Sequence, residues 1–145
     1  MKPENVIFTD ESYQSVKIID FGSSCSDSKT GFSYVQSRYY RAPEVVLGVP
    51  YSHPVDMWSL GCIVYELITG KPIFPGHDEN ELLEYMIVTI GRVPSEMLSN
   101  AKKYKQFYKA TNNYLSFYNH ELIRSKESRL GPKIAEGSQS VDMLL

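Results

Sequence analysis

Two short runs of β-prone residues flank a polar segment at the start of the chain. Val6 to Phe8 and Val16 to Ile19 are the β-prone runs, and Thr9 to Ser15 between them has the composition of a turn. This pattern predicts an antiparallel hairpin. Because Asn5 enters the first strand and Asp20 leaves the second, both side chains are expected at the open end of the hairpin.

A long apolar segment further along predicts a buried helix. Val55 to Thr69 is apolar on nearly every face, and Gly70 follows as a stop signal. Ser52 offers a capping hydroxyl, and Pro54 is suited to the first turn of a helix. Since a helix that is apolar all round is usually buried, we expect this one at the centre of the fold.

A second helix is predicted after Asp78. The run Asp78 to Glu81 resembles a capping box, in which side chains at the start of a helix satisfy its free backbone N–H groups. Apolar residues then recur at helical spacing up to a stop near Gly91, namely Leu82, Leu83, Met86 and Ile90.

Lysines alternate with aromatic residues between Ala101 and His120. One interpretation is binding of single-stranded nucleic acid, by phosphate contacts and base stacking. The other is an amphipathic helix that covers the fold, followed by a strand or loop. The formal net charge of −2 favours the second, and no nucleic-acid partner is expected. The polar residues 121–145 predict an irregular segment.

Composition narrows the class of protein. The chain has 145 residues, of which 42% are hydrophobic and 22% charged, as expected for one globular domain. No apolar run approaches the ~20 residues that span a bilayer, so no membrane partner is expected. The start of the chain lacks a signal-peptide pattern, and Cys25 and Cys62 are too few for a disulfide framework. We therefore expect the protein in the cytoplasm, the nucleus or both.

The open end of the predicted hairpin could carry chemistry. The amide oxygen of Asn5 and the carboxylate of Asp20 are hard ligands of the kind that Mg²⁺ takes, usually one or two from the protein. Water and nucleotide phosphates complete the shell of such a Mg²⁺ ion. Lys2, three residues before Asn5, could place an ammonium group on the same phosphate. The alternative is that Asn5 and Asp20 only cap turns.

Four sequence blocks resemble, in order and spacing, the second half of the protein-kinase signature. They are Lys2-Pro3-Glu4-Asn5, Asp20-Phe21-Gly22, Ala42-Pro43-Glu44 and Asp56-Met57-Trp58-Ser59-Leu60-Gly61. The runs Tyr34 to Glu44 and Asp20 to Cys25 are similar to those of the dual-specificity tyrosine-regulated kinases of the CMGC group, with homeodomain-interacting kinases next closest. The resemblance extends from about Met1 to Tyr108.

This resemblance implies an α+β, protein-kinase-like fold: a mainly α-helical C-lobe with a small β-hairpin, the N-lobe being absent. Residues 1–145 would be a partial kinase domain. They would contain the end of the catalytic loop, the activation segment, two following helices and an insert, without the final C-lobe helices.

The resemblance also implies ATP and Mg²⁺ as cofactors. Lys2 would be catalytic and would contact the γ-phosphate and the substrate hydroxyl. Asn5 would hold one Mg²⁺, and Asp20 would hold metal that bridges the phosphates.

The segment around Tyr34 would carry regulation and substrate choice. Tyr34 aligns with the tyrosine that this family phosphorylates on itself, and Arg38 and Arg41 could pair with that phosphate. Ser37 implies Ser and Thr as acceptors, and Arg41 implies protein substrates with Pro after the acceptor. The family often has Tyr-x-Tyr here, whereas this chain has Phe32-Ser33-Tyr34.

Three further residues would be structural. Glu44 would pair with an arginine late in the fold, which the sequence does not reach. Asp56 would hydrogen-bond the backbone of the catalytic loop, or simply favour the helix dipole as a first-turn acid. Trp58 would pack under the activation segment.

The implied activity is that of part of an ATP-dependent serine/threonine protein kinase, with autophosphorylation on Tyr34. In the family motif the catalytic aspartate stands two residues before the lysine, which here would precede Met1. The 145 residues alone are therefore expected to be inactive. The alternative is a catalytically inactive kinase-lobe fragment that acts as a protein-binding module.

Overall fold

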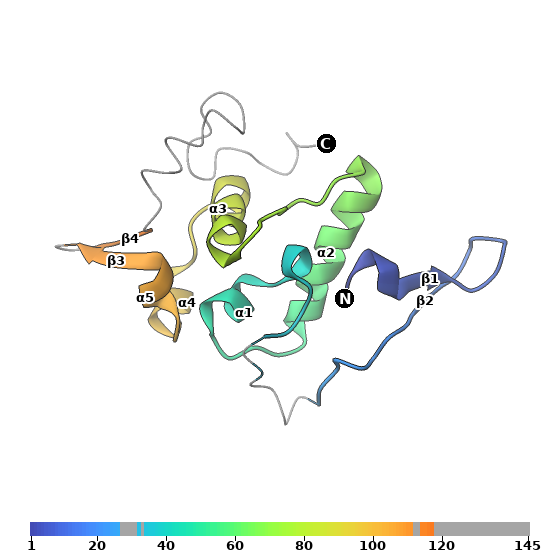
Figure 1. Ribbon diagram of the computed structural model, residues 1–145, viewed down its shortest axis with the longest axis horizontal. Helices are drawn as coiled ribbons and strands as arrows, with labels where there is room; N and C mark the ends of the chain where they lie inside the picture. The colour runs from blue at the N-terminus through green and yellow to red at the C-terminus, as the bar shows by residue number, and fades with distance from the viewer. Residues whose placement is uncertain (27–31, 33, 112–113, 118–145) are drawn as a thin grey trace.

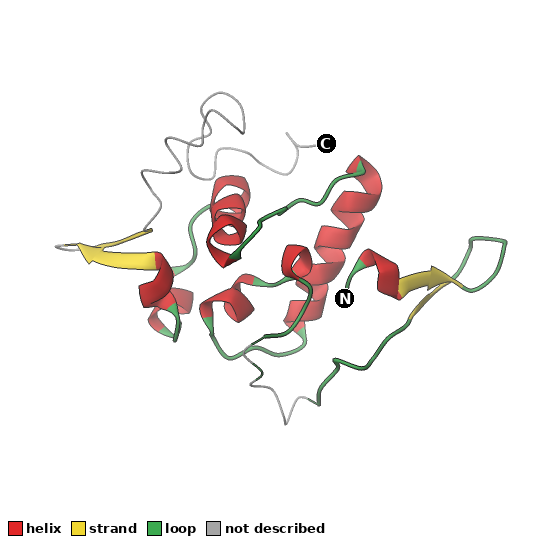
Figure 2. Ribbon diagram, viewed as in Figure 1, coloured by secondary structure: helices red, strands yellow, loops and turns green. Residues whose placement is uncertain are grey.

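The computed structural model describes residues 1–26, 32, 34–111 and 114–117. Helices predominate, and a short hairpin lies at each end of the molecule (Figures 1 and 2). In chain order the elements are η1 (Pro3–Asn5), β1 (Val6–Phe8), β2 (Val16–Ile18), η3 (Arg38–Tyr40), α1 (Pro43–Leu47), α2 (Pro54–Thr69), α3 (Glu79–Ile90), α4 (Ser95–Ser99), α5 (Tyr104–Phe107), β3 (Tyr108–Thr111) and β4 (Tyr114–Phe117).

The predicted N-terminal hairpin is confirmed. Strands β1 and β2 pair antiparallel, with Val6 opposite Ile18 and Phe8 opposite Val16. Phe8 also makes an edge-to-face contact with Tyr13 in the turn, at 4.9 Å between ring centroids. The hairpin stands out from the helices (Figure 1), and its apolar side chains, Phe8 and Val16 among them, are largely exposed.

Helix α2 has the predicted extent but a different start. Pro54 occupies the first turn, and Gly70 ends the helix in the left-handed conformation, at φ 74°. The predicted cap at Ser52 is wrong, because His53 is the N-cap residue and no side chain caps the helix there. The helix is set instead by the proline at its start and the glycine at its end.

The prediction that α2 is buried all round is wrong for the described residues. One face packs into the core through Val55, Ser59, Cys62 and Ile63. Another face is exposed and apolar, and it comprises Met57, Leu60, Val64, Leu67 and Ile68. An all-apolar helix is buried only where other elements pack on every side, and the described elements pack on one side of α2.

Helix α3 begins as predicted. The backbone N–H of Glu81 donates to the Asp78 carboxylate at 2.9 Å, and the Glu81 carboxylate accepts from the N–H of His77 at 2.9 Å. Leu82, Leu83 and Met86 are buried. Ile90, which shares their helical spacing, is 52% exposed. Ile87, one turn beyond Leu83, is buried instead.

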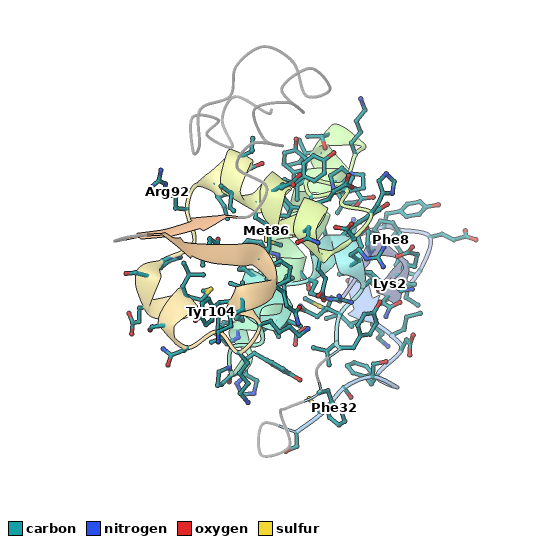
Figure 3. The ribbon with its side chains drawn as sticks, turned by 60° about the vertical axis from the view of Figure 1, so that its left-hand side comes forward. Lys2, Phe8, Phe32, Met86, Arg92 and Tyr104 are labelled. Carbon is teal, nitrogen blue, oxygen red and sulfur yellow. The ribbon has the colours of Figure 1, made fainter. Side chains whose placement is uncertain are left out.

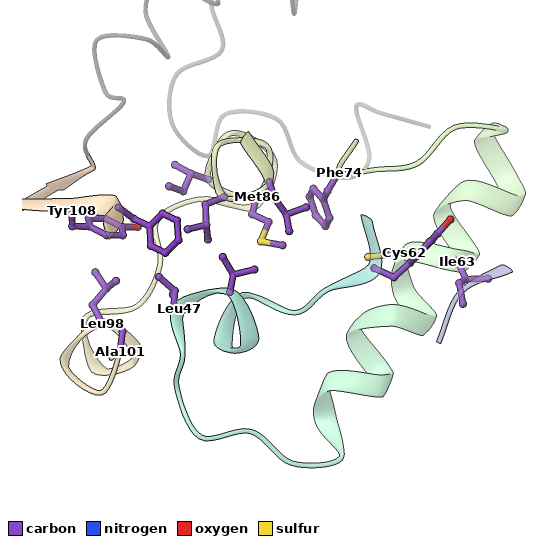
Figure 4. Packing of buried hydrophobic residues seen from close by; sticks show 14 residues of the cluster. Leu47, Cys62, Ile63, Phe74, Met86, Leu98, Ala101 and Tyr108 are labelled. Carbon is purple, nitrogen blue, oxygen red and sulfur yellow. The ribbon is translucent and has the colours of Figure 1, made fainter. Parts of the chain in front are cut away.

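One main hydrophobic core joins the helices. Figure 4 shows side chains from α1, α3 and the segment around α4 packed together, with Leu47 and Met86 among them. A smaller cluster contains Ala42, Val45 and Val55, and Trp58 packs against both clusters. The segment that links η3 to α1 is therefore held directly against α2.

Between residues 101 and 117 the chain forms a very short helix and a second hairpin. Helix α5 has four residues, and β3 pairs antiparallel with β4, Tyr108 opposite Phe117. Phe107 and Tyr108 are buried in the core, so part of the aromatic pattern serves packing. The predicted irregular segment 121–145 lies outside the described residues. No helix among the described residues is long and apolar enough to cross a membrane.

Candidate functional site

At the open end of the first hairpin, the backbone of Asn5 lies opposite the residue that precedes Asp20. The N–H of Ile19 donates to the carbonyl of Asn5 at 2.9 Å, which extends the strand pairing by one step. Asp20 follows directly in the left-handed conformation, at φ 62°. Its exposed carboxylate accepts from the N–H of Gly22 through Oδ1 at 3.3 Å. One oxygen of Asp20 thus caps a turn, as the simpler alternative proposed.

Lys2 lies at the same end. It is the N-cap of η1, and its carbonyl accepts from the N–H of Asn5 at 3.0 Å. Figure 3 labels Lys2 and Phe8 of β1 on the same side of the molecule. Among the described residues no three His, Cys, Asp or Glu side chains cluster as a metal site. Asn5 and Asp20 offer two hard oxygens, which is a donor set that suits Mg²⁺ completed by water and phosphate.

Arg41 is the centre of a second group of predicted residues. Its side chain is only 1% exposed. The guanidinium donates to the carbonyls of Val35 and Gln36 and to the carboxylate of Glu79, each at 3.0 Å. Lys103 lies 3.7 Å from the other oxygen of Glu79. The charge of a buried arginine is thus balanced by Glu79, at the start of α3.

Tyr34 lies on top of this group. Its side chain is 70% exposed, and the guanidinium carbon of Arg41 lies 4.1 Å from the centre of its ring. Arg41, through a hydrogen bond and its charge, and then Arg38 lower the pKa of the Tyr34 phenol. Arg38 also donates to the carbonyl of His77 at 2.5 Å. The two predicted arginines therefore favour negative charge at Tyr34.

Ser37 lies between these residues in the chain but at the surface. It is the N-cap of η3, and its carbonyl accepts from the N–H of Tyr40 at 3.0 Å. The role that the resemblance implies for Ser37, a choice of Ser and Thr as acceptors, stays a prediction.

Asp56 and Trp58, both on α2, contact residues next to these two groups. Asp56 Oδ1 lies 3.8 Å from the backbone nitrogen of Met1, next to Lys2. Trp58 stacks on Phe74 at 5.6 Å between ring centroids and packs against the cluster that contains Ala42. Its indole Nε1 is buried and has no hydrogen-bond partner within the described part of the chain. Glu44 is half-buried in the first turn of α1.

Two residues of this site were missed in the sequence. Gln36 is in the left-handed conformation, at φ 65°, and its side chain bonds to α2 and to Ala42. Glu79 was read only as part of a capping box. A single glutamine carries no spacing signal, and the partner of Glu79 lies 38 residues earlier in the chain.

Comparison with known proteins agrees with the motifs. The family model of the protein kinase domain matches residues 1–139. This chain is 50% identical to the dual specificity tyrosine-phosphorylation-regulated kinase mbk-2 of Caenorhabditis elegans, over 107 residues that make up 74% of the chain. Over the same number of residues and the same share of the chain, it is 48% identical to the human dual specificity tyrosine-phosphorylation-regulated kinase 3. It is 51% identical over 109 residues to the dual specificity protein kinase YAK1 of Saccharomyces cerevisiae, 75% of this chain.

These matches confirm the resemblance to dual-specificity tyrosine-regulated kinases that the sequence blocks indicate. The chain spans only part of those relatives, namely 13% of mbk-2, 18% of the human kinase and 14% of YAK1.

Proposed function

Because this chain belongs to the protein kinase domain family, we propose that it forms part of the C-lobe of an ATP-dependent serine/threonine kinase that also phosphorylates its own Tyr34. The observation that carries this proposal is the backbone bond between Asn5 and Ile19, which holds Asn5 and the neighbouring Asp20 at the same end of a hairpin. In the kinase signature these two positions hold the metal ions.

Each residue at that end has a distinct task in the proposal. Asn5 and Asp20 hold Mg²⁺ through their oxygens, and Lys2 orients the terminal phosphate with its ammonium group. Bound Mg-ATP supplies the phosphoryl group and the metal charge that neutralises its oxygens. Asp56, in the first turn of α2, hydrogen-bonds the backbone of the catalytic loop.

The segment from Tyr34 to Arg41 supports a preference for proline after the phosphorylated residue. The carbonyls of Val35 and Gln36 already accept hydrogen bonds from Arg41. A substrate N–H facing them would compete for occupied acceptors and lose a hydrogen bond that it makes in water. Proline has no N–H to satisfy, so it loses nothing there.

The exposed face of α2 supports a larger domain. Leu67 and Ile68 belong to an apolar face that no described element covers. Exposed contiguous apolar surface of this kind usually marks an interface. We propose that the remaining kinase C-lobe packs there and that an N-lobe completes the ATP site.

A chimera tests this proposal. In it, the 107 residues of mbk-2 that align with this chain are replaced by the residues of this chain, so mbk-2 supplies the remainder. Phosphate transfer from Mg-ATP to a serine peptide is expected. Asp20→Ala should lower kcat/KM at least about 100-fold, since it removes a group that stabilises charge at the reacting phosphate.

Asp10→Ala is the matched control. Asp10 is an exposed aspartate in the turn at the other end of the same hairpin, where it accepts from Ser12. It should leave kcat/KM unchanged. An Asp20→Ala chimera as active as the unmodified one would refute the metal role. An unmodified chimera that folds but transfers no phosphate would favour the protein-binding module instead.

A further inference from the structure

The side chain of Gln36 joins three parts of the fold. Its amide nitrogen donates to the carbonyl of Val55 and to the hydroxyl of Ser59, each at 2.7 Å, and both partners lie on α2. Its amide oxygen accepts from the N–H of Ala42, just before α1, at 2.9 Å. Both ends of one carboxamide are therefore bonded.

The direction of these bonds is fixed by Ser59. This serine is fully buried, and its hydroxyl donates to the carbonyl of Tyr40 at 2.7 Å. A hydroxyl has one proton to donate, so Ser59 receives the bond from Gln36 and passes its own to Tyr40. A carboxylate in place of the Gln36 amide could not donate, and it would face the oxygens of Val55 and Ser59.

The backbone of Gln36 is in the left-handed conformation, at φ 65°, which residues other than glycine rarely adopt. Such strain persists where surrounding contacts hold it. Here the contacts include the three side-chain bonds of Gln36 itself. In this conformation the carbonyls of Val35 and Gln36 both accept from the buried Arg41.

We infer that Gln36 is a positioning residue, whose carboxamide clamps the Tyr34 to Arg41 segment onto α2 and thereby keeps two carbonyls bonded to Arg41. This inference rests on the proposed kinase function where it concerns substrates. If the clamp is lost, the two carbonyls become free to turn outward and accept a substrate N–H. The preference for proline after the phosphorylated residue then falls.

Two substitutions separate the clamp from the turn. Gln36→Glu keeps the length of the side chain and an oxygen for Ala42, but it removes the donor to Val55 and Ser59. Gln36→Gly adopts the left-handed turn without strain and removes every side-chain bond. Gln14→Glu, at an exposed position in the hairpin turn, is the matched control.

The first measurement needs no activity. In the 145-residue chain, amide hydrogen exchange of Ala42 is expected to be at least about tenfold faster in Gln36→Gly, because the Ala42 N–H loses its acceptor. The Leu82 amide, bonded within the start of α3, should be unchanged and reports that the chain is folded. Unchanged exchange at Ala42 would overturn the clamp.

The second measurement is substrate preference in the mbk-2 chimera. Two peptides are compared, one with proline and one with alanine directly after the phosphorylated serine. The quantity of interest is the ratio of kcat/KM for the proline peptide to kcat/KM for the alanine peptide. Gln36→Glu and Gln36→Gly should lower this ratio at least about fivefold, and Gln14→Glu should not. A purely structural defect would lower both values of kcat/KM together and leave the ratio unchanged.

The outcomes separate the two proposals. If the unmodified chimera is active and the ratio is unchanged in both Gln36 variants, the positioning role is wrong and the kinase function stands. If the unmodified chimera transfers no phosphate, the kinase function fails, and the exchange rate of Ala42 still decides whether Gln36 is a clamp.

Discussion

Substituting Glu79 by glutamine tests the electrostatics around Arg41. The guanidinium is 1% exposed and lies 3.0 Å from the Glu79 carboxylate, which is itself 27% exposed. Glu79→Gln preserves size and an oxygen acceptor but removes the negative charge. The arginine keeps its bonds to the carbonyls of Val35 and Gln36.

The expected loss follows from these contacts. Breaking a fully buried ion pair costs about 3 to 5 kcal/mol, because an uncompensated charge stays in the interior. Glu79 is partly exposed, so water screens the pair, and the amide oxygen still accepts from Arg41. We therefore expect a loss of about 1 to 3 kcal/mol in the free energy of unfolding.

Lys103→Met is the matched comparison. Lys103 approaches the other oxygen of Glu79 at 3.7 Å, and both side chains are about one quarter exposed. A pair of this kind is worth about 0 to 1 kcal/mol. Removal of Lys103 should therefore cost less than removal of the Glu79 charge.

Urea unfolding measures both losses. Trp58 is the only tryptophan, and its stacking on Phe74 makes its fluorescence a reporter of the core. Glu79→Gln should lower the urea midpoint with an unchanged slope, and Lys103→Met should lower it less. Equal losses in the two variants, or no loss in Glu79→Gln, would refute the view that Glu79 balances a buried charge.

Three further predictions concern the framework. In Gly76→Ala the new Cβ would lie 2.5 Å from the Leu82 nitrogen, so the backbone must shift, and the melting temperature followed by circular dichroism should fall. Asp78→Ala removes the bond to the Glu81 N–H and should cost about 1 kcal/mol in urea unfolding, whereas Asp78→Ser should cost less. Burial raises the pKa of the Cys62 thiol from 9.0 to about 12, so the unfolded chain loses this proton first. Stability should then fall as pH rises from 9.0 towards 12, and urea midpoints above pH 9.0 should show a shallower fall in Cys62→Ala.

The sequence predicted the elements whose signals are local. The β1–β2 hairpin follows from two β-prone runs around a polar turn, and the start of α3 follows from the Asp78 to Glu81 run. In both cases the residues that make the signal also make the hydrogen bonds. The second hairpin was not predicted, because lysines and aromatics between 101 and 117 fit several local structures.

The exposed face of α2 shows where such reasoning fails. The pattern from Val55 to Thr69 indicates which residues could be buried, but burial depends on what packs against them. Cys62 and Ile63 meet the core, whereas Leu67 and Ile68 have no described element on their side. Periodicity alone contains no information about how many neighbours a helix has.

The candidate site divides in the same way. Tyr34, Arg38 and Arg41 were found because they belong to a sequence block that resembles a known family. Gln36 and Glu79 were missed because their roles depend on distant partners: Val55 lies 19 residues from Gln36, and Arg41 lies 38 residues from Glu79. The bonds of Gln36 to α2 became visible only when the turn and the helix were placed side by side.

The mass of the endogenous protein tests most directly whether these residues are one part of a larger kinase domain. A peptide antibody against Asp78 to Ile90, used under denaturing conditions, would capture the product for intact mass measurement. We predict a mass well above the 16.6 kDa of this chain, because the chain spans only 13% of mbk-2 and 18% of the human kinase. A product of 16.6 kDa would contradict this account and would direct the search to binding partners of a short, inactive chain.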